Sequence, residues 1–169
     1  MRIPKTLFTS LVPLSVWFSG RPQLAGLTRG LMRSFGSVTM FLTRAKPQAD
    51  LASIGAEWQR MFPSDDLVPI TGSDDDTVYA EIHMQCPHRG TGNVSGCHRM
   101  MEYDRKMLGR IGGQLVVLRS QAEPGVEICQ LAIRQAGPST ADLTAAHERA
   151  AAAGGRSAGE RSVKPGSPH

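Results

Sequence analysis

The sequence predicts an α+β fold: an antiparallel four-stranded sheet with helices packed on one face, a basic N-terminal helical arm and a disordered C-terminal tail. Two patterns in the middle of the chain predict the sheet and its helices. In two segments, apolar residues recur at three- and four-residue steps, which predicts helices. In four shorter segments, apolar residues alternate with polar ones or form a continuous run, which predicts strands. The resulting order of helix, strand, strand, helix, strand, strand favours antiparallel pairing with helices on one face.

Composition divides the 169 residues into three parts. Residues 1–48 form the basic arm, residues 49–135 form the α+β domain, and residues 136–169 form the tail. The tail is rich in Ala, Gly, Ser and Pro and has scarcely an apolar side chain larger than Ala. It therefore cannot bury enough surface to offset the entropy of ordering, although residues 141–153 favour a transient helix.

The first half of the domain reads as a helix and a hairpin. Asp50 is a helix-capping residue, and the apolar positions that follow it have helical spacing as far as Pro63. Residues 67–70 predict a short strand and residues 71–76 a turn. Residues 78–84 alternate apolar and polar side chains, which is typical of a half-buried strand. We expect the two strands to pair.

The second half repeats this order. Residues 87–96 form a glycine-rich loop, and residues 94–111 predict a helix that Gly112 and Gly113 end. Residues 114–119 and 126–134 predict two further strands, joined by a turn at residues 122–125.

The arm carries the basic charge of the protein. Residues 1–46 hold seven Lys or Arg and no acid, so this segment is +7 while the whole chain is +4. Residues 24–42 predict an amphipathic helix that either lies on an anionic membrane or packs its apolar stripe on the domain. The apolar residues 7–18 are too few to cross a bilayer, and the large Phe18 is unfavourable for signal-peptide cleavage after Gly20. No aromatic platform for nucleic acid accompanies the basic residues.

Three cysteines at irregular spacing do not predict a disulfide framework, so we expect a reducing, cytoplasmic location, with membrane association left open through the arm.

An acid occupies the apolar stripe of the predicted helix 94–111. Asp104 shares this stripe with Cys97 and with four apolar residues, because they follow one another at three- and four-residue steps. A buried carboxylate must be paired, hydrogen-bonded or protonated, because an isolated charge costs several kcal/mol there. The pattern therefore marks Asp104 as a candidate functional residue.

The other two cysteines are predicted to lie near this helix. Cys129 shares its side of the last strand with Leu131 and Ile133, which is the side expected to face the helix. Cys86 begins the loop before the helix, where the helix dipole lowers a thiol pKa and favours an anion. Buried free cysteines are common core residues, so simple packing remains an alternative.

This arrangement of Cys86-Pro87, a glycine-rich loop, Cys97 with an acid seven residues later, and Gly125-x-x-x-Cys129 resembles the L-2-amino-thiazoline-4-carboxylic acid hydrolase family. It is also similar to the related vinyl-reductase-type small-molecule-binding domain. The resemblance covers about residues 51–134. It implies hydrolytic opening of a small cyclic amidine or thiazoline acid, or binding of a small molecule without turnover.

The resemblance places the family's cysteine and acid positions on Cys86, Cys97, Asp104 and Cys129. Ring opening needs attack at the carbon between sulfur and nitrogen, together with proton transfer. We expect Cys97 to act as the nucleophile and Asp104 to carry the proton.

The substrate carboxylate is expected at the loop, on His88, Arg89, Gly90 and Gly92. No cofactor is expected. A zinc site from the three cysteines with Asp104 or His88 is the alternative, although the sequence has no C-x-x-C pair. The oligomeric state is left open.

Overall fold

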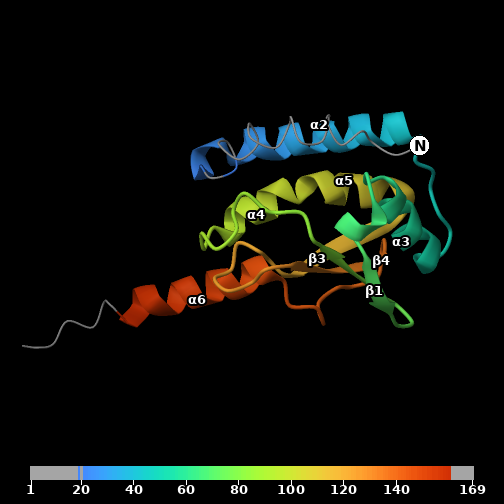
Figure 1. Cartoon of the computed structure of the whole chain (residues 1–169). Coiled ribbons are helices and arrows are strands. Elements are labelled where there is room, and N and C mark those ends of the chain that lie inside the picture. The colour runs from blue at the N-terminus through green and yellow to red at the C-terminus, as the bar shows by residue number, and fades with distance from the viewer. Residues whose placement is uncertain (1–18, 20, 161–169) are drawn as a thin grey trace, which may run out of the picture.

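Three layers are stacked in the computed structural model, which describes residue 19 and residues 21–160. Helix α2 (Ala25–Thr43) is the outermost layer, helices α4 (Val94–Met100) and α5 (Glu102–Ile111) lie beneath it, and the sheet follows (Figure 1). The short 3-10 helix η1 (Pro22–Leu24) leads into α2. The α+β fold expected from the sequence is confirmed.

The sheet has four antiparallel strands in the order β1-β2-β4-β3. Its strands are β1 (Ile70–Ser73), β2 (Val78–Ile82), β3 (Gly113–Arg119) and β4 (Cys129–Gln135). The predicted hairpin of the first two strands is confirmed. Its first strand begins later than predicted because Asp65–Leu67 form a 3-10 helix, η2, capped by the side chain of Ser64. A register shift interrupts β1 between Ile70 and Gly72.

Helix α3 (Leu51–Arg60) begins at the predicted cap, where Asp50 accepts a 2.8 Å hydrogen bond from the backbone N–H of Ser53. Its residues Ile54 and Trp58 are fully buried against the sheet and α5. Burying such side chains contributes on the order of 1.5 to 3 kcal/mol each. This helix therefore anchors the domain core.

The helix predicted over residues 94–111 is divided at Met101. Residues 94–100 form α4 and residues 102–111 form α5, and the backbone of Met101 has φ −66° and ψ 0°. The predicted stripe is nonetheless buried along its full length. Its members are Val94, Cys97, Met101, Asp104, Leu108 and Ile111.

Strand β4 supplies the centre of the sheet's inner face. Cys129, Leu131 and Ile133 are buried on the side predicted to face the helices. Leu131 pairs with Ala80 on β2 and with Val117 on β3, so apolar rows run across three strands.

Helix α2 packs on α5 and α4 through a face that the sequence did not predict. The buried residues of this face are Thr28, Met32, Gly36, Thr39 and Thr43. Small residues in this row allow close approach: a Cβ added at Gly36 would lie 2.9 Å from the backbone oxygen of Tyr103. The hydroxyl of Thr39 also lies 3.0 Å from that of Tyr103. Leu27, Val38 and Phe41 of the apolar stripe are exposed outside this contact, while Leu31, Phe35 and Leu42 are half-buried.

The described part of the C-terminal segment differs from the disorder that composition predicts. Residues Ala146–Glu160 form helix α6, and Ala146 is buried in the domain core. Arg134 on β4 binds both carboxylate oxygens of Asp142, at 2.7 and 2.6 Å. Composition alone did not reveal this, because one bidentate ion pair and small alanines fix the segment rather than large apolar residues.

Candidate functional site

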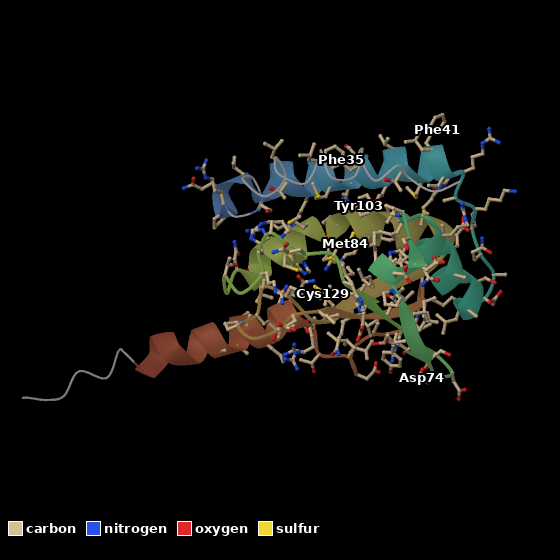
Figure 2. The ribbon with its side chains drawn as sticks, in the orientation of Figure 1. Phe35, Phe41, Asp74, Met84, Tyr103 and Cys129 are labelled. Carbon is tan, nitrogen blue, oxygen red and sulfur yellow. The ribbon has the colours of Figure 1, made fainter. Side chains whose placement is uncertain are left out.

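The three cysteines form one chain of neighbouring thiols, in the order Cys86, Cys97 and Cys129, between the helical layer and the sheet. Cys86 lies in the segment between β2 and α4, Cys97 lies on α4, and Cys129 is the first residue of β4 (Figure 2 labels Cys129). Cys97 contacts both of the others through its sulfur. All three thiols are free, with Cys86 half-buried and the other two buried. The predicted approach of Cys97 to Cys129 is thus present.

The three thiols differ in the direction of their pKa shifts. Contact with the Cys97 thiol, followed by burial, raises the pKa of the Cys86 thiol. Contact with the Cys129 thiol raises the pKa of Cys97 to about 11. Contact with Cys97 lowers the pKa of Cys129, and so does the backbone N–H of Gln121, which lies 3.3 Å from its sulfur. Burial opposes both effects.

Negative charge therefore rests most easily on Cys129, one of the two buried thiols. This differs from the expectation of a lowered thiol pKa at Cys86, because the pKa of that thiol is raised. Contact with Cys97 and burial outweigh the one backbone donor at Cys86, the N–H of His88, which lies 3.4 Å from the sulfur.

Asp104 lies beside the inner end of the chain. Burial raises its pKa to about 6, although the indole Nε1 of Trp58 donates a 3.1 Å hydrogen bond to its Oδ1. The charge of Asp104 also opposes ionisation of Cys129. An acid with a pKa near 6 exchanges protons in the neutral range, as expected of a proton carrier.

The loop after Cys86 does not offer the anion site that its glycines predict. The backbone N–H groups of Gly90 and Gly92 donate to the carbonyl oxygens of Gln121 and Ala122, each at 2.8 Å. The N–H of Gly96 at the start of α4 is bonded to Asn93. These donors serve to hold the loop against the turn before β4.

The two side chains expected to bind a substrate carboxylate have different surroundings. His88 is buried, and its Nε2 lies 2.6 Å from the hydroxyl of Ser19. Burial lowers the pKa of His88. Arg89 is at the surface, where it forms a 3.2 Å ion pair with the exposed Glu127. Of His88 and Arg89, only Arg89 is exposed to a ligand that arrives from solvent.

A second cluster, which the sequence analysis did not select, lies at the edge strand β3. The rings of His98 and His147 stack with centroids 3.8 Å apart, which joins α4 to α6. Arg105 donates to Nδ1 of His98 at 2.9 Å. A cavity of about 590 Å³ is lined by these three residues together with β3 and residues 139–148. No local sequence pattern predicts this pairing, because the two histidines are 49 positions apart.

Within the described residues, no group of three or more His, Cys, Asp or Glu side chains is arranged to hold a metal ion. Comparison with protein-family models, with curated proteins and with solved structures found no match to this chain.

Proposed function

We propose that the protein hydrolyses a small cyclic amidine or thiazoline acid, and that the three-thiol chain is its nucleophilic centre. One observation carries the proposal: the chain leads from the half-buried Cys86 to Cys129, whose thiol has a lowered pKa. The motif resemblance of residues 51–134 supplies the substrate class.

The chain acts as a proton relay in this proposal. The Cys129 thiolate takes the proton of Cys97, and Cys97 takes the proton of Cys86. Charge rests on Cys129 before the reaction, and the relay removes the proton of Cys86, the thiol nearest to solvent, only as Cys86 attacks the substrate. Such pairing of a nucleophile with an internal base is a general means of activating a thiol.

The Cys86 sulfur attacks the ring carbon that is bonded to both sulfur and nitrogen. The ring nitrogen takes a proton, the bond from that carbon to the ring sulfur breaks, and the ring sulfur leaves as a thiol after protonation. Water next attacks the same carbon and releases Cys86. One water is consumed, and Asp104 buffers the relay by exchanging a proton beside Cys129.

Arg89 is the proposed carboxylate-binding group. It follows Cys86 in a turn closed by a 3.0 Å hydrogen bond from its backbone N–H to the Cys86 oxygen. Its partner Glu127 is 81% exposed at the side chain, so the ion pair is worth little and exchanges readily for a substrate carboxylate.

The test is turnover of 2-amino-thiazoline-4-carboxylate, followed by release of a new thiol. We expect Cys86→Ser to reduce turnover by roughly a hundredfold or more, since the covalent step is lost. Arg89→Gln should raise KM with little change in kcat. Ser95→Ala, an exposed change on α4, and Arg110→Gln, an exposed change on α5, are the matched controls. A purified wild-type protein that leaves thiazoline and related cyclic amidine acids intact would refute the proposal.

We propose binding of a small molecule without turnover as the alternative function. The burial of Cys97 and Cys129, both 3% exposed, favours it, because a ligand reaching them would be enclosed. In that case thiazoline acids are not turned over, and a bound ligand raises the melting temperature in proportion to its concentration.

A further inference from the structure

The outward surface of α2 is apolar although the helix is already packed. Leu27, Val38 and Phe41 are 56%, 53% and 82% exposed. At 3.6 residues per turn these three positions fall on one side of the helix. Figure 2 shows Phe41 on the side of α2 that faces away from the domain.

The core does not need this surface, because other residues make the contact with α5. Gly36 and Thr39 lie against Tyr103 of α5. The hydroxyl of Thr28 bonds to the carbonyl of Leu24 at the end of η1, and that of Thr43 bonds to the carbonyl of Thr39. Leu31, Phe35 and Leu42 extend the outward stripe as partly exposed side chains. Large exposed apolar side chains gathered on one helix typically mark an interaction surface.

Positive charge accompanies the stripe. Arg21, Arg29, Arg33, Arg44 and Lys46 are all exposed on α2 or at its ends. The sequence holds no Asp or Glu before Asp50. Arg33 has an ion partner, Glu102, at 3.3 Å, but that acid belongs to α5. A surface that covers the stripe therefore meets an excess of cations.

We propose that α2 lies in the plane of an anionic bilayer, with Leu27, Val38 and Phe41 inserted among the acyl chains and the basic side chains at the phosphates. The helix has 19 residues and so is about 28 Å long, and it is the outermost layer of the domain. It can therefore rest on a flat surface with the remaining layers behind it. No helix in the described ranges has the length and apolarity required to cross a bilayer, so the contact is peripheral.

Charge argues against a second copy of the chain as the occupant. A symmetric α2-to-α2 contact would bring Arg29, Arg44 and Lys46 of both copies together, and residues 1–49 contain no acid to pair with them. An anionic lipid surface satisfies both the apolar stripe and the cations.

The full chain is tested by flotation with vesicles of phosphatidylcholine alone or with 30% phosphatidylglycerol, at low and at high salt. We expect binding to the anionic vesicles only, weakened by salt. The double substitution Val38→Ser with Phe41→Ser should lower the partition coefficient by roughly tenfold or more. Arg44→Gln with Lys46→Gln should lower it and reduce its dependence on salt.

Ile128→Ser is the matched control, because Ile128 is 37% exposed but lies in the turn before β4. We expect it to leave flotation unchanged. Equal flotation of the Val38/Phe41 variant and the wild type would overturn the proposal. So would a stable dimer, seen by sedimentation, that this double substitution converts to a monomer, since α2 would then be a protein interface.

Discussion

Trp58 donates its indole hydrogen to Asp104 inside the core, where Trp58 is fully buried and Asp104 is 5% exposed. This bond favours the ionised carboxylate but does not offset the cost of burial, since the pKa stays at about 6. Asp104 is therefore a destabilising residue when it is ionised.

Replacing Asp104 by Asn should stabilise the protein at pH 8. The amide oxygen of Asn still accepts from Trp58, while the buried charge is removed. Given a pKa of about 6 against 3.8 for the unfolded chain, the free energy of unfolding should rise by about 1 to 3 kcal/mol. Urea unfolding at pH 8 measures this. Asp104→Leu is the control and should be about 1 to 3 kcal/mol less stable than Asp104→Asn, because it leaves the indole without an acceptor.

Asp104 and His98 should give opposite dependences of stability on pH. The raised pKa of Asp104 means that its contribution is complete below pH 3.8 and is lost as pH rises through about 6. Burial and Arg105 lower the pKa of His98 to about 4, so its contribution is complete above pH 6.5 and is lost as pH falls through about 4.

Relative to the wild type, we therefore expect the stability of Asp104→Asn to fall and that of His98→Gln to rise as the pH is lowered from 6.5 to 4. Gln retains an acceptor for Arg105. Unfolding curves at four or five pH values in this window measure both slopes. Identical slopes in the two variants would contradict the assigned pKa directions.

The thiols should react in an order set by burial and hydrogen bonding. Cys86 is the half-buried one, but its raised pKa keeps it a thiol near pH 7, so maleimide should label it slowly and faster as pH rises. Cys97 and Cys129 should be labelled only after unfolding. Mass spectrometry of the labelled peptides gives the order, and prior labelling of Cys129 in the native protein would show that the interior is open.

The contact of α2 with α5 should depend on one glycine. At Gly36 an added Cβ meets the Tyr103 backbone oxygen at 2.9 Å, so Gly36→Ala should destabilise by about 1 to 3 kcal/mol. Gly30 lies on the same helix with nothing within 4 Å of an added Cβ. Gly30→Ala should therefore stabilise by up to about 1 kcal/mol, through helix propensity. Thermal unfolding of the two variants compares steric cost with propensity directly.

The sequence predicted those features that depend on regular spacing. The buried stripe from Val94 to Ile111 and the inward side of β4 follow from periods of 3.6 and 2, which survive even the division of the helix at Met101. The hydrophobic pattern did not predict the contact face of α2. This face uses threonines and a glycine, and their close fit to α5 is visible only in three dimensions.

The sequence predicts which residues meet at the candidate site, but it does not predict their pKa shifts. The sequence spacing predicts that Cys97 and Cys129 lie close together. Their pKa shifts depend on contacts that spacing does not predict, such as the N–H of Gln121 at the sulfur of Cys129. Gly90 and Gly92 were expected to bind a substrate carboxylate, but their N–H groups are bonded within the protein. Their acceptors come from residues about 30 positions later, which no local pattern reveals.

The interrupted first strand decides how this sheet meets other molecules. An unpaired strand edge invites another chain to extend the sheet, but β1 has only four residues, its register shifts between Ile70 and Gly72, and Asp74, Asp75 and Asp76 follow it directly. The opposite edge, β3, has α6 packed beside it. Backbone pairing with another chain is therefore disfavoured at both edge strands, so aggregation through strand addition is suppressed. Association with partners is expected at the helical surface instead.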